Sequence, residues 1–335
     1  MCRPPASASR RRWPMSRRTC FSWRSSFEEQ AIEAPRMDGV IVIDKPAGIT
    51  SAQVVAAVKR CLKGTKVGHT GTLDPAATGV LVCTVGAATR LSRFFLAAPK
   101  TYRATCRLGE ETDTQDAEGQ VTATRPVTVN EARVRAAAAR FEGRLTQVPP
   151  VFSALKHRGV PLYRLARDGK PVTKPPRPVT VYRLEVLSVD LPEVVLEVEC
   201  SAGTYVRTLC ADLGAALECG GHLTALRRTA CAGFALEEAL SLAELEDLGR
   251  QGRIAERIID MNAALRQMPK VTASPPLAQR IAHGGRLTAA DIAPPAGKGP
   301  LKVLDRRQRL LAVVTFDPGT QRYDYACVMP HPTVT

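Results

Sequence analysis

The segment GHTGTLDPAATGVL, residues 68–81, has the features of a loop that could carry chemistry. Its single acidic residue, Asp74, stands directly before Pro75 with glycines on both sides of the pair. Because glycine lets the backbone approach a ligand closely, Asp74 could be a catalytic carboxylate held on a rigid loop. An Asp-Pro pair is also suited to begin a helix, with aspartate as the cap and proline in the first turn. Periodicity alone does not choose between these two interpretations.

Residues 149–178 form a second segment of unusual composition. Between Lys156 and Arg177 there are seven Lys or Arg residues against one acid, with prolines and aromatic side chains interspersed. Such a mixture suits a loop that follows a phosphate backbone and stacks on a base. A solvated surface loop can have the same composition, so the segment is compatible with RNA binding without requiring it.

The sequence lacks the motifs of several other kinds of chemistry. The glycine-rich segment has no P-loop lysine, and neither a GxGxxG dinucleotide motif nor a GxSxG nucleophile elbow is present. Ten cysteines and five histidines form no CxxC, HxH, HxxxH or HExxH pattern, so we expect no metal site. We therefore expect no cofactor. Without a secretory signal, the cysteines are interpreted as reduced thiols in a reducing compartment, the cytoplasm.

Hydrophobic periodicity indicates the elements that must position these segments. The β-branched run over residues 40–43 predicts a strand covered on both faces, and Thr50 or Ser51 then caps a helix. Residues 194–200 alternate as in a half-buried strand, and a helix with one apolar stripe follows shortly after. Further strands are predicted over residues 103–108, 301–304, 310–316 and 323–329, and residues 80–82 form an apolar run within a Gly- and Thr-rich stretch. Further helices are predicted over residues 130–141 and after a capping box of Ser241 and Glu244.

Length and charge set the class of protein. With 335 residues, of which 44% are hydrophobic and 24% charged, the chain is long enough for about two domains with sizeable cores. No run approaches the roughly 18–20 apolar residues that a membrane span needs, so we expect no membrane association. The net charge of +15 favours a polyanionic partner, because binding to nucleic acid releases condensed counterions. Charge alone leaves a merely basic protein as an equal alternative.

Residues 1–36 differ in character from the rest of the chain. They hold eight Arg and three Glu and show no hydrophobic periodicity. We expect a disordered basic arm, or a stretch upstream of a true start at Met37, although the composition also resembles an organelle transit peptide.

Several motifs, in order, give the sequence a family resemblance. Residues 68–81 resemble the catalytic signature of the tRNA pseudouridine-55 synthases, the TruB family of pseudouridine synthases. The segments GVIVIDKPAGITS, KTYRA, LGEETDTQD, PPVFSALK and SAGTYVRTL are similar to further motifs of that family, in the same order (residues 39–51, 100–104, 108–116, 149–156 and 201–209). The resemblance covers about residues 37–265, is loose over residues 270–335 and is absent from residues 1–36.

This resemblance implies a fold and a reaction. The implied fold is α+β, with a mixed, mostly antiparallel central sheet flanked by helices over residues 37–265, the pseudouridine synthase fold. Residues 149–178 would be an RNA-binding thumb loop, and residues 270–335 a small β-rich, PUA-like RNA-binding domain. The implied activity isomerises uridine 55 in the T-loop of tRNA to pseudouridine after base flipping, without a cofactor or metal. The implied partner is the tRNA T stem-loop, bound by a monomer with no guide RNA.

The resemblance also implies which residues carry the reaction. Asp74 would be the catalytic nucleophile, and Arg207 would pair with it to keep it charged and aimed. Without the resemblance, Arg207 would be interpreted as a surface arginine in the first turn of a helix. Tyr102 would stack on the uracil, and its phenol is a candidate for handling the C5 proton. Whether Asp74 attacks the sugar, attacks the base or promotes a glycal stays open.

Four further residues receive substrate-binding roles from the resemblance. Tyr205 would close the pocket near the arginine, and Leu226 would supply an apolar wall. His69 would reach into the RNA and fill the space that the flipped base leaves, and Lys45 would contact phosphate nearby. Taken alone, such tyrosines and leucines are more often plain core residues, and such a histidine is more often an ordinary loop residue.

Three other interpretations stay open at this point. The chain could be a non-catalytic RNA-binding protein on the same scaffold, or belong to the guide-RNA-dependent branch of the same superfamily. It could also be a basic protein that binds acidic partners non-specifically, but that interpretation does not account for the ordered motifs. Activity of the purified chain on bare tRNA would separate an enzyme that acts alone from the first two.

Overall fold

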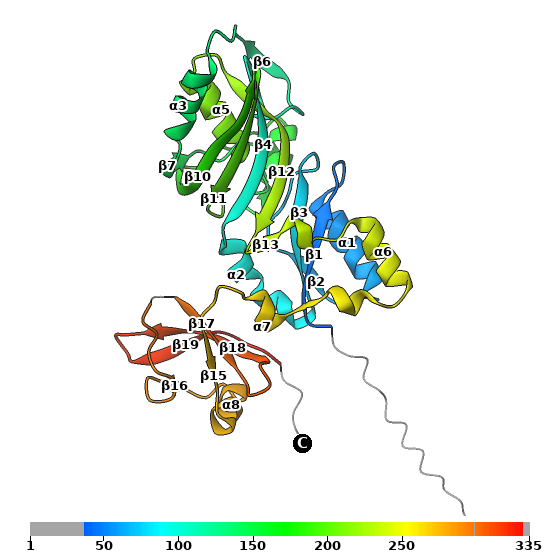
Figure 1. Cartoon of the computed structure of the whole chain (residues 1–335), viewed down its shortest axis with the longest axis vertical. Coiled ribbons are helices and arrows are strands. Elements are labelled where there is room, and N and C mark those ends of the chain that lie inside the picture. The colour runs from blue at the N-terminus through cyan, green and yellow to red at the C-terminus, as the bar shows by residue number, and fades with distance from the viewer. Residues whose placement is uncertain (1–36, 298, 331–335) are drawn as a thin grey trace, which may run out of the picture. The chain divides into compact units, whose positions relative to one another are not determined.

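Within the described residues, 37–297 and 299–330, the computed structural model contains one large sheet of ten strands (Figure 1). The predictions for residues 1–36 lie outside the described residues. The strands of this sheet are β1 (Gly39–Lys45), β2 (Val67–His69), β3 (Thr78–Val85), β4 (Lys100–Leu108), β7 (Gly143–Gln147), β10 (Arg177–Asp190), β11 (Glu193–Cys200), β12 (Gly221–Cys231), β13 (Phe234–Ala235) and β14 (Ile259–Asp260).

One parallel pair divides this sheet into two antiparallel halves. The main strand order is β14-β1-β3-β12-β4-β11-β10-β7, with β2 beside β3 and β13 beside β12. β12 runs parallel to β3, whereas the other neighbours in the large sheet are antiparallel. At the junction, a Cβ on Gly79 would lie 2.2 Å from the carbonyl oxygen of Arg228, so only glycine fits there. The predicted mixed, mostly antiparallel α+β fold is confirmed.

Each half of the sheet has its own helices and core. Beside β1 and β3 lie α1 (Ser51–Cys61) and α6 (Leu242–Arg250), whose apolar residues pack on Ile41 and Ile43. On the other half, α3 (Glu131–Ala139) and α5 (Val206–Ala216) pack on β4, β10 and β11 (Figure 1). The remaining helices are α2 (Ser92–Ala97), α4 (Leu162–Arg167), α7 (Met261–Ala264) and α8 (Pro275–Ala282), with short 3-10 helices η1 (Gly86–Leu91), η2 (Leu236–Glu238) and η3 (Ile254–Arg257).

The predicted helix starts are confirmed. The Thr50 hydroxyl accepts from the Gln53 backbone N–H and the Gln53 side chain accepts from the Thr50 N–H, which makes a capping box for α1. Ser241 and Glu244 form the same device at α6. These local bonds satisfy backbone donors that a helix leaves unpaired at its first turn.

A second, smaller sheet lies near the C-terminus, as predicted. It has five strands, β15 (Lys270–Thr272), β16 (Leu287–Thr288), β17 (Pro300–Leu304), β18 (Leu310–Asp317) and β19 (Arg322–Val328), in the order β15-β17-β18-β19-β16. Ile281 of α8 packs with Val303, Val314 and Tyr323 in its core. β17, β18 and β19 match the predicted ranges to within about one residue, whereas the short strands β15 and β16 were not predicted.

The segment that was predicted to be a thumb loop, residues 149–178, contains regular structure of its own. It holds a two-stranded hairpin of β8 (Lys156–His157) and β9 (Val160–Pro161), followed by α4. Leu162 at the start of α4 is fully buried, and the guanidinium groups of Arg164 and Arg167 lie 6.0 and 5.7 Å from the ring of Tyr163. We keep the name thumb for residues 149–178. A further hairpin consists of β5 (Glu110–Thr112) and β6 (Val121–Thr124).

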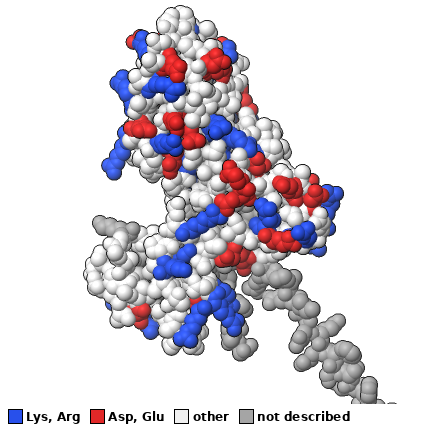
Figure 2. Space-filling view, in the orientation of Figure 1, with Lys and Arg blue, Asp and Glu red and all other residues white. Residues whose placement is uncertain are grey.

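Charged side chains are mixed on the surface. On the face shown in Figure 2, basic and acidic side chains are interspersed over the part that carries the large sheet. Among the described residues, no helix is both long and apolar enough to cross a membrane.

Candidate active site

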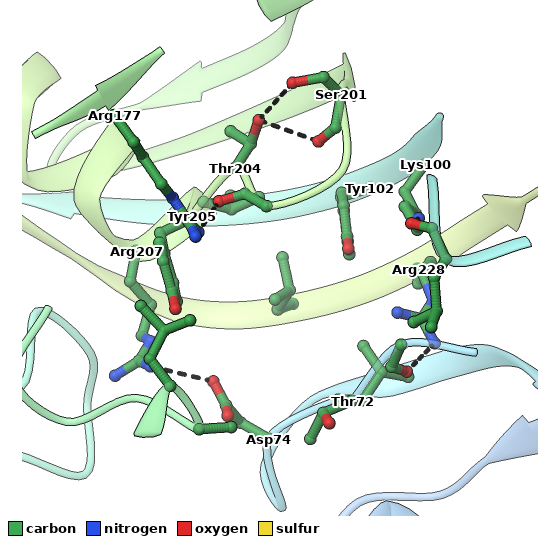
Figure 3. A pocket seen from close by; sticks show the side chains of 18 residues that line it. Thr72, Asp74, Lys100, Tyr102, Arg177, Ser201, Thr204, Tyr205, Arg207 and Arg228 are labelled. Atoms are coloured by element: carbon green, nitrogen blue, oxygen red, sulfur yellow. Dashed lines mark hydrogen bonds and ion pairs between the residues drawn. The ribbon is translucent and has the colours of Figure 1, made fainter. Parts of the chain in front are cut away.

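A cavity of about 380 Å³ opens at the junction between the two halves of the large sheet. The loop before β3 supplies one wall, and β4 and β12 supply the floor (Figure 3). The thumb, α2 and the start of α5 with the loop before it complete the lining. Five of the seven predicted site residues line this cavity: Asp74, Tyr102, Tyr205, Arg207 and Leu226. The junction of the sheet therefore brings together motifs that lie far apart in the sequence.

Asp74 and Arg207 point toward each other at one end of the cavity (Figure 3). The Nη2 atom of Arg207 lies 3.3 Å from the Oδ2 atom of Asp74. The Asp74 side chain is 50% exposed, so it can still be reached from the cavity. No helix follows Asp74, so the alternative of an aspartate that caps a helix is wrong. A half-exposed carboxylate held by a guanidinium can act as a nucleophile.

Arg207 is buried at the start of α5, so its interpretation as a surface arginine is also wrong. Its Nη1 atom donates to the Asp116 carboxylate at 3.0 Å and to the carbonyl of Thr114 at 3.0 Å. Its Nη2 atom donates to the carbonyl of Phe152 in the thumb at 2.8 Å. These bonds fix the guanidinium in one orientation. That orientation determines which of its nitrogens lies beside the Asp74 carboxylate.

We call residues 71–77 the catalytic loop, because they carry Asp74, the predicted nucleophile. Lys45 lies under this loop and holds it in place. Lys45 is 0% exposed, and its Nζ atom donates to the carbonyls of Pro46, Pro75 and Ala77 at 2.9, 3.0 and 2.6 Å. Burial lowers the pKa of this ammonium, and the negative charge of Asp74 opposes that shift. Because no part of the side chain reaches the surface, the structure gives no support to the phosphate contact predicted for Lys45, and that contact stays a prediction.

The other side of the catalytic loop is fixed as well. The Ser51 hydroxyl donates to the Leu73 carbonyl at 3.1 Å and accepts from the Leu73 N–H at 2.9 Å. The Gly48 N–H donates to the Pro75 carbonyl at 2.9 Å. The loop before β3 is therefore shaped by the N-terminal motif of residues 39–51, although it contains no regular structure of its own.

Replacing Lys45 by methionine tests its structural role. We expect the free energy of unfolding to fall by about 1–3 kcal/mol, because the carbonyls of Pro46 and Ala77 lose the ammonium that donates to them. The Pro75 carbonyl loses the same donor but keeps its bond from the Gly48 N–H. Affinity for tRNA should keep its salt dependence, whereas loss of a phosphate contact would reduce the slope of log K against log salt by about 1. Urea unfolding measures the stability, and binding titrations at several salt concentrations measure the slope. A reduced slope with unchanged stability would support the predicted contact between Lys45 and phosphate.

Tyr102 lies on β4 in the cavity floor, and Leu226 lies on β12 beside it. Burial raises the pKa of the Tyr102 phenol to about 12, although the positive charge of Arg228 acts in the opposite direction. The phenol is therefore protonated at neutral pH and can donate a hydrogen bond. Its position in the cavity wall supports the predicted contact with a base.

Tyr205 precedes α5 and is held at both its ring and its backbone. The guanidinium of Arg177 lies 5.1 Å from the centre of its ring, within the range of a cation–π contact. The buried side chain of Gln147 accepts from the Tyr205 N–H at 3.0 Å and donates to its carbonyl at 3.3 Å. Sequence reasoning missed Gln147 and assigned Arg177 only to a basic stretch.

His69 is not among the residues that line the cavity. It ends β2, where it pairs with Cys83 of β3, and its Nδ1 atom is buried without a partner among the described residues. Burial and the charge of Arg228 lower the pKa of His69, so the ring is neutral at neutral pH. Its predicted contact with RNA stays a prediction.

Asp116 and Arg228 are two polar residues of the site to which the sequence analysis gave no role. Asp116 lay inside the quoted motif of residues 108–116, and its place at the end of that motif was the available signal. Arg228 follows Leu226 by two residues on the same strand, so period-two alternation places both side chains on one face. This alternation could have been used to predict from the sequence that Arg228 lies on the same face as Leu226, in the site.

Comparison with known proteins decides the family. The model of the TruB family pseudouridylate synthase N-terminal domain matches residues 59–206, and that of the tRNA pseudouridylate synthase B C-terminal domain matches residues 207–268. A tRNA pseudouridine synthase B from Burkholderia mallei is 46% identical over 286 residues, which cover 84% of this chain and 94% of that protein. The chain belongs to the TruB family of pseudouridine synthases.

Other relatives agree with this assignment. The tRNA pseudouridine synthase B of Syntrophotalea carbinolica is 42% identical over 289 residues, covering 85% of this chain and 94% of that protein. A chain in the crystal structure of an archaeal box H/ACA sRNP Nop10-Cbf5 complex superposes with a TM-score of 0.68 at 28% identity, covering 90% of this chain and 89% of the other. This TruB family member is therefore a pseudouridine synthase, an isomerase that converts uridine to pseudouridine in tRNA.

Proposed function

We propose that this enzyme isomerises uridine 55 in the T-loop of tRNA, with Asp74 as the nucleophile. The observation that carries the proposal is the Asp74 carboxylate, half exposed in the cavity and 3.3 Å from a buried guanidinium. Uridine and pseudouridine contain the same atoms, so the reaction needs no group donor. The N1–C1′ bond breaks, a C5–C1′ bond forms, the C5 proton leaves and N1 takes up a proton.

The chain's own groups have distinct parts in this reaction. Asp74 forms and later releases a covalent bond to the nucleoside, which a carboxylate can do at a centre of oxocarbenium character. Arg207 orients Asp74, and Tyr102 with Leu226 contacts the uracil ring. Tyr205 closes the side of the cavity where its ring meets Arg177.

The target uridine must leave the folded T-loop to reach the cavity. Base flipping costs a few kcal/mol, which contacts to the surrounding phosphates and sugars can offset. We assign those contacts to the basic thumb, whose residues Ala154 and Leu155 also line the cavity. We also assign residues 270–335 to a PUA-like RNA-binding domain, because the turn between β17 and β18 exposes Arg306, Arg307 and Arg309.

The purified full-length chain and a T-arm hairpin provide the test. We expect the single protein to convert the T-loop uridine without any added RNA or protein, measured by nucleoside chromatography after digestion. A hairpin with cytidine at the target position is the matched control and should remain unchanged. Conversion of a uridine elsewhere in the tRNA, with none at the T-loop, would contradict the proposed position.

The guide-dependent alternative has one observation in its favour. A structural relative lies in a box H/ACA sRNP complex. The 46% identity to a tRNA pseudouridine synthase B favours an enzyme that acts alone. A chain that modified RNA only after a guide RNA and partner proteins were added would reverse this choice. The monomeric state and the cytoplasmic location remain predictions.

A further inference from the structure

Two buried cations lie at the end of the cavity opposite Arg207 (Figure 3). Arg228 is 1% exposed and Lys100 is 6% exposed, and both line the cavity. Within residues 37–297 and 299–330, neither side chain forms an ion pair with a carboxylate. Burial of a charge is costly unless it is compensated, so this end of the cavity favours a negatively charged occupant.

The two cations differ in how fully the protein uses them. The Lys100 ammonium donates to three backbone carbonyls, those of Phe95, Leu96 and Ala98, which accounts for its three hydrogens. Arg228 donates from Nε to the Val80 carbonyl at 2.6 Å and from Nη2 to the Gly71 carbonyl at 3.1 Å. These bonds use two of its five hydrogens. Of the two cations, Arg228 therefore has N–H groups left that can donate hydrogen bonds to a molecule in the cavity.

The remaining terminal nitrogen of Arg228 lies at the cavity wall. A Cβ added to Gly71 would be 3.6 Å from Nη1, which places Nη1 against the catalytic loop. Arg228 also lies close enough to Tyr102 to interact with its phenol, on the strand next to the one that carries Tyr102. A uracil that stacks on Tyr102 would thus have a fixed positive charge at its edge.

The reaction requires a positive charge beside the uracil ring, because negative charge develops on that ring. If Asp74 attacks C1′, the electron pair of the N1–C1′ bond goes to N1 and the uracil departs as an anion. If a glycal forms, the base departs with the same pair of electrons. If Asp74 instead attacks C6, the π electrons of the C5–C6 double bond form a C4–C5 double bond. The π electrons of the C4 carbonyl move to O4, which gives an enolate. The uracil ring therefore becomes negative on each of the three routes, while Arg207 lies at the other end of the cavity.

We propose that Arg228 stabilises the negative charge that develops on the uracil ring during isomerisation. The proposal rests on the function proposed above and adds a catalytic residue on the base side of the pocket. Preorganised donors aimed at developing charge in a dry site are worth far more than they are in water. The same side chain also holds Gly71 in the catalytic loop, so the test must separate charge stabilisation from loop positioning.

A pair of T-arm hairpins, with uridine or 5-fluorouridine at the target position, makes that separation. Fluorine withdraws electron density from the ring, so an anionic base needs less help from the protein. We expect Arg228→Gln to slow single-turnover loss of uridine by about 10²–10³-fold. Loss of 5-fluorouridine should slow at least tenfold less. Both rates follow from nucleoside chromatography of quenched reactions, with hairpin affinity measured alongside.

Arg227→Gln is the matched control on the neighbouring residue. Arg227 pairs with Asp44 at 2.7 Å and is not among the residues that line the cavity. We expect this variant to keep the wild-type ratio between the two substrates, whatever its effect on stability. If Arg228→Gln does not fold, as judged by its thermal unfolding, Arg228→Lys replaces it. Arg228→Lys keeps the positive charge but loses the planar guanidinium. We expect it to slow the loss of uridine less than Arg228→Gln would, and to slow the loss of 5-fluorouridine less than the loss of uridine.

Equal slowing of both substrates by Arg228→Gln or Arg228→Lys would overturn the proposal, because a displaced catalytic loop slows every substrate alike. Undiminished turnover of uridine by the folded Arg228→Gln variant would overturn it too. Failure of the function itself looks different. In that case the wild-type chain would convert neither hairpin.

Discussion

Replacing Asp74 by asparagine is expected to abolish isomerisation of tRNA while leaving tRNA binding unchanged. An amide has nearly the shape of the carboxylate but cannot form the covalent bond to the nucleoside. Loss of a nucleophile of this kind costs roughly 10⁴-fold or more in rate. Single-turnover conversion of a T-arm hairpin and a binding titration measure the two quantities separately. Because the side chain is 50% exposed, we expect little change in stability.

Asp113→Asn is the matched control for this variant. Asp113 lies in the motif of residues 108–116, accepts from the Gln120 N–H at 2.8 Å and does not line the cavity. Its replacement removes one carboxylate from the same part of the chain and should leave turnover within a few-fold of the wild type. Normal turnover by Asp74→Asn would refute the assignment of the nucleophile.

The second large effect is expected from Arg207→Lys, although the substitution preserves the charge. Arg207 uses both terminal nitrogens at once, toward Asp74, Asp116 and the carbonyls of Thr114 and Phe152. A lysine ammonium offers no planar fork and cannot serve these partners together. We expect the single-turnover rate to fall by about 10²–10³-fold, with a smaller effect on hairpin affinity.

Asp116→Asn shows how much of this effect passes through the orientation of Arg207. Asp116 accepts from Arg207 Nη1 at 3.0 Å and does not line the cavity, so it acts as a positioning residue. In a double-mutant cycle, groups that work through one another lose less together than the sum of their separate losses. We therefore expect the variants at 116 and 207 to be non-additive in rate. Strict additivity would mean that Asp116 acts independently of the arginine.

Much of the fold could be predicted because its elements follow simple periodicities. β1 is an unbroken β-branched run covered on both faces, and α6 begins with a capping box that is complete in the sequence. In the small C-terminal sheet, β17 and β18 are apolar runs bounded by turn residues. The hairpin and helix within the thumb were not predicted, since its elements are too short and too polar to show a period.

The site was predictable only as far as motifs extend. The family resemblance pointed to the pairing of Asp74 with Arg207. Local sequence pattern alone would have interpreted Asp74 as a helix cap and Arg207 as a surface arginine. Burial decides both cases, and burial depends on contacts between distant segments. The same reason applies to Lys45: a lysine in a basic protein suggests phosphate, whereas its ammonium here donates to three carbonyls.

The environment of Lys45 has a consequence for how the enzyme meets its substrate. The carbonyls of Pro75 and Ala77 accept hydrogen bonds from the ammonium of Lys45, which lies on β1. The Leu73 carbonyl accepts a hydrogen bond from the Ser51 hydroxyl. Asp74, the nucleophile of the proposed function, is thus set in place when the polypeptide folds, before any nucleic acid arrives. Preorganisation of this kind removes an ordering cost from the encounter. If the substrate is the T-arm, as proposed, we expect the energy gained on docking it to be available for everting a single nucleotide.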